Sequence, residues 1–479
     1  MTSIRIRRPA RHAVVIGGGL AGTLAAAACI PYVDKVTIVE RDELPDGPVP
    51  RKGLPQARHA HMLWSGGARA MEALVPGVTD AWLAAGAHRI PLPTGMVSYS
   101  PAGWYRRWHK ESHFLIACSR DLLDWTVRDR VLKSSAVRLL TGTEPQRLTG
   151  TSHRVDGVIV RLPDGAERHL AADLVVDACG RSSRAPQLLH GLGVPAPPEE
   201  EIDAGVVYAS RLYKAPAVVE HPPVINIQAD ARRRRPGQAA TIVPIEGDRW
   251  FVAVSGTRGG APTGDTSEFV DFALGLRHPL VGEVLSRAEP LGDVAVSRST
   301  VNRRRYWEKP AAAPEGFVIV GDAVAALNPV YGHGMSVAAL GALALRNQLE
   351  RSDVRSAGFA RRVQRAVARP TDVAWTLATG QDMHFPGSKG RKPTAFDRLL
   401  QRYVNRLTLT AIGSFRVAKA LTDVMTLQKG VAPLVRPDVV LAALRGPQLP
   451  LLGHPPLTDR EREALTPETV SEADASTSG

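Results

Sequence analysis

The fold is decided by residues 12–30, HAVVIGGGLAGTLAAAACI. This stretch combines a short apolar strand, a G-x-G-x-x-G turn at Gly17, Gly19 and Gly22, and an alanine-rich helix that opens with Leu20 and Ala21. The first glycine permits a tight strand-to-helix turn, the second lets the backbone approach a pyrophosphate, and the third lets the helix pack against the sheet. The helix N-terminus then offers unpaired N–H groups to phosphates. The stretch predicts the first unit of a Rossmann-type dinucleotide-binding domain.

A second strand and an acidic residue follow this unit. Residues 34–42, DKVTIVERD, predict a strand that ends at Glu40, about 20 residues beyond the glycine turn, where an acid usually holds ribose hydroxyls. Arg41 either lies along the adenosine or stays on the surface. A lone glycine motif is weak, but strand, helix, second strand and acid occur together here. The motif does not choose between NAD and FAD, although its place at the start of the chain favours FAD.

Two later segments predict further parts of a nucleotide site. Residues 171–189, AADLVVDACGRSSRAPQLL, predict a strand ending at Asp177 and a turn at Gly180. In residues 315–349, a strand ends at Gly321 and Asp322, Pro329 stops local helix, and Gly332–Met335 opens a long helix. A carboxylate at a strand end can hold a ribityl hydroxyl. A glycine-rich helix N-terminus can direct N–H dipoles at a flavin edge that gains negative charge on reduction.

Composition and charge limit the other classes of protein to which the chain could belong. The chain has 479 residues and a formal net charge of +13, which fits either a nucleic-acid or membrane partner or simply a solvated basic surface. We favour the last, because no nucleic-acid motif accompanies the arginine run 232–235. Three separated cysteines predict neither a disulfide framework nor a zinc site. The basic, apolar N-terminus mimics a signal peptide, but its glycine spacing and the following strand favour a cytoplasmic protein without stable membrane insertion.

Residues 53–77, GLPQARHAHMLWSGGARAMEALVPG, carry two histidines that are two positions apart. On a strand, His59 and His61 would share a face and could bind a metal, but no third ligand cluster accompanies them. We therefore expect no metal site, and we interpret His61 and Trp64 as walls of a pocket. The aromatic residues Tyr99 and Trp104, together with their neighbours Tyr105 and Trp108, either line a long apolar pocket or pack in the core.

Taken together, the segments around residues 17–22, 177–183 and 321–335 resemble the three motifs of single-component FAD monooxygenases with the para-hydroxybenzoate hydroxylase fold. Several stretches, including RKGLPQARHAHMLWSGGAR (51–69), IACSRDLLDWTVR (116–128) and GDAVAALNPVYGHGMS (321–336), narrow the resemblance. They are similar to the flavin-dependent polyene epoxidases of polyether biosynthesis, the group that contains the lasalocid and monensin epoxidases. The similarity runs from about residue 10 to residue 450.

This resemblance implies a set of FAD-binding residues. It places the pyrophosphate on the glycine turn, the adenosine ribose on Glu40, the ribityl–phosphate chain near Arg120 and Asp322, and the isoalloxazine at Pro329 and the following turn. The loop that begins at Arg51 and Lys52 lies near the flavin in relatives. The full set is Gly17, Gly19, Leu20, Ala21, Gly22, Glu40, Arg41, Arg51, Arg120, Gly321, Asp322, Pro329, Gly332, Gly334 and Met335.

The resemblance also implies a reaction. A flavin C4a-hydroperoxide transfers oxygen to alkenes of a linear polyene polyketide, which is either free or carried on an acyl carrier protein. An alkene needs no general base, so no catalytic side chain is named. O₂ is the oxidant, and NADPH or a separate flavin reductase supplies electrons. Many relatives have Asp-Gly in the second motif, whereas this chain has Asp177-Ala178-Cys179-Gly180. In the hydroxylases this motif helps to meet NADPH, so the altered form argues against direct reduction by NADPH.

Three alternatives stay open. An FAD-dependent aromatic polyketide hydroxylase would share the fold and the motifs. A flavin-dependent halogenase would need a W-x-W-x-I-P stretch and a lysine, and the segment GWYRRWHK (103–110) does not supply that stretch. In the third alternative, the basic surface belongs to a binding protein that has lost its redox chemistry.

The predicted architecture is α/β: a Rossmann-type FAD-binding domain, an interleaved antiparallel β-sheet substrate domain and C-terminal helices. Alternating apolar residues in the middle of the chain predict the antiparallel sheet. The expected segments are the FAD domain (1–90, 115–185 and 300–350), the substrate domain (91–114 and 186–299), a helical region (351–450) and a disordered tail rich in Pro, Glu, Ser and Thr (451–479).

Overall fold

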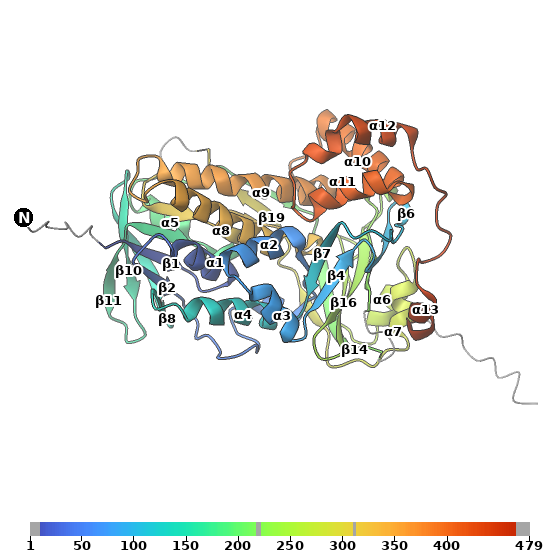
Figure 1. The fold of residues 1–479 in the computed structure, drawn as a ribbon, viewed down its shortest axis with the longest axis horizontal. Coiled ribbons are helices and arrows are strands. Elements are labelled where there is room, and N and C mark those ends of the chain that lie inside the picture. The colour runs from blue at the N-terminus through green and yellow to red at the C-terminus, as the bar shows by residue number, and fades with distance from the viewer. Residues whose placement is uncertain (1–9, 217–221, 310–312, 466–479) are drawn as a thin grey trace, which may run out of the picture.

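The computed structural model describes residues 10–216, 222–309 and 313–465. Its fold is mixed α/β, as predicted: a parallel sheet covered by helices lies beside a largely antiparallel sheet, and a group of helices from the C-terminal part of the chain lies against both (Figure 1).

The parallel sheet builds the predicted dinucleotide-binding unit. Its strand order is β20-β12-β1-β2-β8, and every neighbouring pair is parallel. Strands in such a sheet are buried on both faces, which explains their continuous valine and isoleucine runs. The strands are β1 (His12–Ile16), β2 (Lys35–Val39), β8 (Val137–Leu140), β12 (Leu174–Asp177) and β20 (Phe317–Ile319).

Helices and a small sheet surround this parallel sheet. Helix α8 packs on α1, α2 and α9, and its small residues Ala338, Ala339 and Ala342 are buried in that contact. The helices are α1 (Leu20–Cys29), α2 (Ser65–Leu74), α3 (Val78–Ala84), α4 (Arg120–Leu132), α5 (Ala185–His190), α8 (Gly334–Arg351) and α9 (Phe359–Asp382). The small antiparallel sheet consists of β9 (Glu144–Gly150), β10 (Val155–Arg161) and β11 (Glu167–Ala171).

A seven-stranded sheet forms the second layer. Its order is β18-β14-β17-β16-β15-β5-β6, and all pairs are antiparallel except β15 with β5. Helices α6 (Phe269–Leu274) and α7 (Leu280–Leu285) cover one face. The strands are β5 (Met96–Ser100), β6 (Gly103–Trp104), β14 (Val207–Lys214), β15 (Val224–Ile227), β16 (Gln238–Ile245), β17 (Arg249–Gly256) and β18 (Ala295–Ser297).

Two smaller sheets join the layers. One contains β3 (Leu63–Trp64), β4 (His88–Leu92) and β7 (His113–Ala117), and the other contains β13 (Glu199–Asp203), β19 (Asn302–Arg305), β21 (Ala325–Ala326) and β22 (Lys389–Gly390). Six 3₁₀ helices are described: η1 (Pro55–Arg58), η2 (Gly180–Ser182), η3 (Ala231–Arg233), η4 (Gly321–Ala323), η5 (Pro329–Tyr331) and η6 (Ala432–Val435).

The C-terminal helices form what we call the cap, which consists of α10 (Ala395–Gly413), α11 (Phe415–Met425), η6 and α12 (Pro437–Arg445). Figure 1 shows the cap at one end of the molecule, above the strands β4, β6 and β7. Within the described residues, no helix is both long and apolar enough to cross a bilayer.

The tail differs from its prediction over part of its length. Residues 459–465 form helix α13 (Asp459–Leu465), whose Leu465 is buried in the core beneath α6 and α7. The carboxylate of Glu461 pairs with the guanidinium of Arg107, with Nη2 to Oε1 at 2.8 Å. Composition alone predicts disorder here, but a few anchoring contacts hold the segment. Residues 466–479 lie outside the described residues.

Candidate active site

The turn between β1 and α1 leaves no room for side chains at two of its glycines. Gly17 has φ +104°, and a Cβ placed there would lie 2.7 Å from the carbonyl oxygen of Ala178. A Cβ on Gly22 would lie 1.8 Å from the carbonyl oxygen of Gly17. Only hydrogen at these positions allows α1 to approach β1 and β12 this closely. The turn therefore has the geometry that a dinucleotide-binding motif requires.

The groups around this turn fit the phosphates and ribose of a dinucleotide. No side chain caps the first turn of α1, so its N–H groups remain available to a ligand. Arg51 is 7% exposed, its buried Nε lacks a partner, and its Nη2 lies 3.8 Å from where a Cβ of Gly19 would stand. Glu40 accepts hydrogen bonds from the amides of Gly18 (2.6 Å) and Asp42 (2.9 Å). This fixes the carboxylate, whose remaining lone pairs suit ribose hydroxyls.

Asp322 lies at the end of β20, at the meeting point of the first and third motifs. It is half-buried, and Arg181 Nε is 3.9 Å from its Oδ2. Burial raises the pKa of the Asp322 carboxyl, and the guanidinium groups of Arg181, Arg120 and Arg303 oppose this shift. Gly321 has φ +66°, and a Cβ there would lie 2.7 Å from the Cβ of Ala21. This glycine lets the third motif pack directly on α1.

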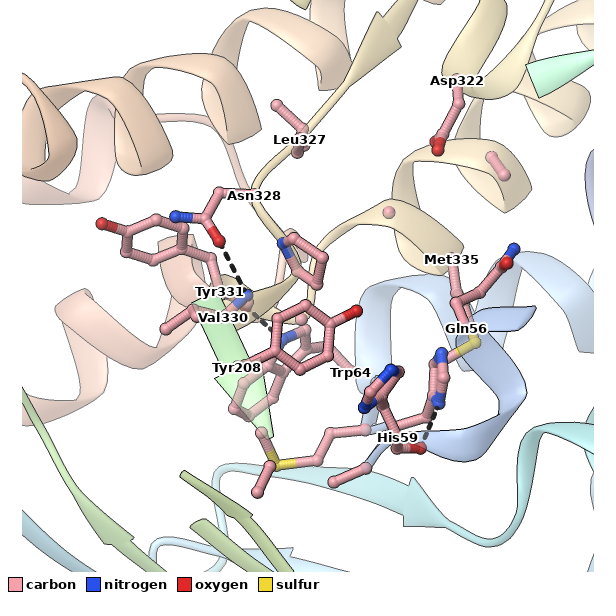
Figure 2. Close-up of a pocket in the computed structure, with 18 of the residues that line it drawn as sticks. Gln56, His59, Trp64, Tyr208, Asp322, Leu327, Asn328, Val330, Tyr331 and Met335 are labelled. Atoms are coloured by element: carbon pink, nitrogen blue, oxygen red, sulfur yellow. Dashed lines mark hydrogen bonds between the residues drawn. The ribbon is translucent and has the colours of Figure 1, made fainter. Parts of the chain in front are cut away.

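A buried hydrogen-bond network holds the turn that leads into α8. Asp382, at the end of α9, is 2% exposed and accepts from Tyr331 Oη (2.6 Å), Asn328 Nδ2 (2.9 Å) and Asn302 Nδ2 (2.7 Å). The Asn328 amide oxygen in turn accepts from the Val330 backbone N–H (3.2 Å; Figure 2). Residues from three distant segments thus fix this turn.

The first turn of α8 presents backbone donors to the same space. Its N-cap is His333, and no side chain caps the helix. Gly332 has φ +66°, and a Cβ there would lie 3.2 Å from Nε1 of Trp64. The Trp64 indole N–H itself donates to the Tyr331 carbonyl oxygen at 3.4 Å (Figure 2). These uncapped amides suit a flavin ring that becomes negatively charged on reduction.

Two histidines and a tyrosine form the facing wall. The rings of His59 and Tyr208 meet edge to face with centroids 4.2 Å apart (Figure 2). His59 Nδ1 is 2.9 Å from Ser210 Oγ. Burial lowers the pKa of His59 to about 4, helped by Arg58. Burial, with Arg120 nearby, also lowers the pKa of His61 to about 3. His61 Nδ1 donates to the His59 carbonyl oxygen (2.8 Å), so the neutral ring keeps a lone pair on Nε2.

Most of these groups line one cavity of about 1070 Å³. It contains every sequence-predicted cofactor residue except Gly22 and Gly321, which instead support the packing beneath it. The predicted pocket residues His61 and Trp64 also line it, as do Tyr105 and Trp108. Arg41 reaches the cavity with a largely exposed side chain that pairs with Asp42 (3.4 Å).

Tyr99 and Trp104 do not line the cavity, in contrast to their prediction as pocket residues. Along β5, Met96 and Ser98 face the cavity, and strand alternation turns Tyr99 to the opposite face. Tyr99 is paired with Trp104 across the hairpin, with ring centroids 4.8 Å apart. Both rings contact His278 beside α7. They belong to the core of the seven-stranded sheet.

The second motif borders the cavity, and its carboxylate is held by hydrogen bonds within the motif. Asp177 is 1% exposed and accepts from Cys179 N (2.8 Å) and Ser183 Oγ (2.7 Å). Burial raises its pKa, and these hydrogen bonds oppose the shift. Within the described part of the chain, no three His, Cys, Asp or Glu side chains gather as a metal-ligand set.

Sequence reasoning missed two groups of cavity residues. One is the Asp382 network, whose members are separated by up to 80 residues and carry no local motif. The other is the inner face of the cap. It contributes Val404, Thr408, Ala418, Leu421, Thr422, Val424, Met425, Thr426 and Leu434. The four-residue spacing of Val404 and Thr408 on α10 was the available signal for the second group.

Comparisons with known proteins agree with this geometry. The FAD dependent oxidoreductase family matches residues 13–186. Protein Rv3254 of Mycobacterium tuberculosis (strain ATCC 25618 / H37Rv) is 32% identical over 395 residues, which are 80% of this chain and 82% of that protein.

Solved structures share the fold at low identity. The flavin-dependent brominase Bmp2 superposes with a TM-score of 0.64 at 15% identity, over 91% of this chain and 99% of that chain. PqsL of Pseudomonas aeruginosa, a probable FAD-dependent monooxygenase, has a TM-score of 0.53 at 19% identity, over 79% of this chain and 99% of that chain. Structural likeness at such identities shows the fold alone. The fold, the dinucleotide cradle and the sequence relative together establish that the chain belongs to the same family as Protein Rv3254 and is an FAD-dependent oxidoreductase.

Proposed function

We propose that this FAD-dependent oxidoreductase is a monooxygenase that epoxidises alkenes of a linear polyene polyketide in polyether biosynthesis. The observation that carries the proposal is the distal wall of the cavity, formed by the lining residues within 92–108, 226–257 and 404–434. Most of these side chains are apolar, and Arg106 is the one charged group among them. The wall offers neither a carboxylate nor an imidazole. An alkene suits such a wall because it needs no general base.

The chain's residues would contribute positioning and exclusion of water. FAD, when bound and reduced, supplies the means to activate O₂ as an electrophilic oxygen donor. The uncapped N–H groups at the start of α8 would stabilise negative charge on the ring. Trp64, Tyr208 and Met335 would shield the ring from solvent. The distal wall would hold one double bond in a reactive pose, a contribution of roughly 7–11 kcal/mol at best.

The reductant is part of the proposal. NADPH or a separate flavin reductase would supply the electrons, and the polyene would arrive free or on an acyl carrier protein. Comparing turnover with each donor, and with carrier-bound and free polyene, separates these routes.

An aromatic polyketide hydroxylase is the second candidate, and one observation favours it. The neutral His61 keeps an unprotonated Nε2 at the cavity, which could accept a proton from a phenol. The halogenase alternative has less support, although Bmp2 is named as a brominase. No lysine lines the cavity in the part of the chain that the structure describes, and a halogenase of this fold is expected to need one.

Product analysis distinguishes these functions. Purified protein loaded with FAD is incubated with a linear polyene polyketide, isotopically labelled O₂ and a reductant, in the presence of bromide. Mass spectrometry is expected to find one labelled oxygen per converted double bond and no bromine. A brominated product, or labelled oxygen in an aromatic polyketide but not in the polyene, would overturn the proposal.

A further inference from the structure

Exposed apolar side chains concentrate on the cap. Of the thirteen large hydrophobic side chains that are exposed in the described residues, nine lie within residues 396–451. They are Phe396, Leu399, Leu400, Val431, Val435, Leu441, Leu444, Leu449 and Leu451. A concentration of this kind marks an interaction surface, whereas single exposed apolar residues are ordinary.

Helix α10 carries the clearest part of this surface. Phe396, Leu399, Leu400, Tyr403 and Leu407 follow one another at helical spacing and so share one face. Phe396 is 70% exposed, Leu399 62% and Leu400 37%, whereas Tyr403 is half-buried and Leu407 fully buried. The apolar face that packs in the cap is therefore uncovered over the first two turns. We call Phe396, Leu399 and Leu400 the α10 tip.

The surroundings of the α10 tip are strongly basic. Residues 391–451 contain ten Lys and Arg but three Asp and no Glu, a formal charge of +7 out of +13 for the whole chain. Those three carboxylates are already paired: Asp397 with Arg391, Asp423 with Lys419 and Lys429, and Asp438 with Arg416 and Arg436.

The charges nearest the α10 tip remain uncompensated. Lys392 and Arg398 donate to the backbone carbonyl oxygens of Ser388 (3.3 Å) and Pro393 (2.7 Å) rather than to carboxylates. Arg402 is exposed one turn further along the helix. Positive charge thus flanks the exposed Phe and Leu side chains.

The same helix also forms part of the cavity wall. Val404 and Thr408 of α10 line the cavity, together with Leu421 of α11 and Leu434 of η6. The exposed turns of α10 therefore continue directly into turns that line the cavity. Figure 1 shows the cap at one end of the molecule, with α10, α11 and α12 grouped there.

We propose that the α10 tip docks on an anionic lipid surface. Aromatic and leucine side chains flanked by Lys and Arg are the combination that lies in the headgroup region of a bilayer, with the cations attracted to acidic lipids. A neutral protein partner would explain the leucines but not the excess of uncompensated positive charge, and an acidic protein partner would leave the protein without affinity for vesicles. Docking there would bring the cavity wall next to the phase in which an apolar chain dissolves. The docking itself does not depend on the proposed reaction.

Vesicle binding tests this proposal without turnover. The full-length, FAD-loaded protein is sedimented with vesicles of phosphatidylcholine alone or with added phosphatidylglycerol, at low and at high salt. We expect binding only with phosphatidylglycerol, and weaker binding at high salt. The variant Arg398→Gln/Arg402→Gln should bind on the order of tenfold more weakly. Phe396→Ser/Leu399→Ser should also weaken binding, and these exposed positions can change without loss of folding.

Matched controls come from elsewhere on the surface. Arg234→Gln/Arg235→Gln removes two exposed charges from the loop after η3, and Leu291→Ser removes one exposed leucine. Both should bind like the parent protein. Equal losses in the controls, or equal binding to both kinds of vesicle, would overturn the proposal. So would concentration-dependent self-association that Phe396→Ser/Leu399→Ser abolishes without any affinity for vesicles, because a second copy would then cover the tip.

Discussion

At the scale of single residues, the turn that leads into α8 depends on one buried carboxylate. Asp382 accepts three hydrogen bonds, from Tyr331, Asn328 and Asn302, and is 2% exposed. Burial raises the pKa of this carboxyl, and its three donors oppose the shift. A carboxylate satisfies three donors because it is an acceptor at both oxygens. Few other side chains could replace it there.

The variant Asp382→Asn should loosen the turn. Its amide brings donors toward other donors, and an unsatisfied buried polar group costs about 1–3 kcal/mol. We expect at least tenfold weaker FAD binding and a changed visible spectrum of the bound flavin, measured by titrating apoprotein. Tyr331→Phe removes a single donor and should show a smaller loss. Asp271→Asn on α6 lies far from the turn and should bind like the parent. Unchanged affinity of Asp382→Asn for FAD would mean that the turn keeps its conformation without this carboxylate.

Substitutions at two glycines of the first motif should separate the binding of FAD from the folding of the chain. A Cβ on Gly19 would meet only Arg51 Nη2, at 3.8 Å, so Gly19→Val should fold yet fill the space of the pyrophosphate. A Cβ on Gly22 would lie 1.8 Å from the Gly17 carbonyl oxygen, so Gly22→Ala should disturb the fold itself.

We therefore expect Gly19→Val to be purified colourless with a near-parent melting temperature, and Gly22→Ala to melt several degrees lower. The ratio of flavin to protein absorbance and the circular dichroism melt measure the two effects. A yellow, fully loaded Gly19→Val would show that the dinucleotide lies elsewhere.

At the scale of elements, local patterns were sufficient for the strand–turn–helix units. Gly17, Glu40 and Asp322 could be placed from the sequence because each follows its strand within a few residues, and sterics at the turn then fix the geometry. The sequence left Tyr99 open between the cavity and the core, since which face of a strand points inward depends on its neighbours. Helix α13 was missed because its composition is typical of disorder, whereas the contact of Glu461 with Arg107 is long-range.

A substitution on α10 should test whether the cap sets the length of the substrate chamber. Val404 lines the cavity from this helix, so Val404→Trp should fill its distal end. We expect KM to rise several-fold for long polyenes and to change little for short alkenes, with FAD affinity unchanged. Val49→Trp, at an exposed position outside the cavity, should change neither value. An equal effect on short and long substrates would place the chamber away from the cap.

At the scale of the whole molecule, the site lies where separate parts of the chain meet. The cradle comes from residues 16–61, 120 and 177–188, the turn before α8 and its supports from 322–338 and 377–385, and the distal wall mainly from the seven-stranded sheet and the cap. The resemblance to a known family identifies the cradle residues, because they lie in motifs that are contiguous in the sequence. The contact of Asn302 with Asp382, and that of the cap with the seven-stranded sheet, follow from packing that no single segment encodes.

Stability should fall in mild acid, because buried histidines are neutral in the folded protein. Burial lowers the pKa of His59 and of His333 to about 4 each, with Arg58 adding to the shift at His59 and the Met425 carbonyl opposing it at His333. Unfolded histidine has a pKa of about 6.5. Between these values the unfolded chain binds more protons, so each histidine should remove about 1.4 kcal/mol of unfolding free energy per pH unit as the pH falls. This loss begins near pH 6.5 and ends near pH 4.

Single variants isolate the contribution of each histidine ring to the acid-induced loss of stability from that of the carboxyl groups elsewhere in the chain. His59→Gln and His333→Gln should each reduce the decline in melting temperature between pH 7 and pH 5, whatever they cost at neutral pH. His109→Gln, at an exposed position, should leave the decline unchanged. The melts are best compared in apoprotein, because bound FAD would add its own pH dependence. If both buried-histidine variants lose stability as steeply as the parent, these rings are already protonated in the folded protein, and burial would not be lowering their pKa values.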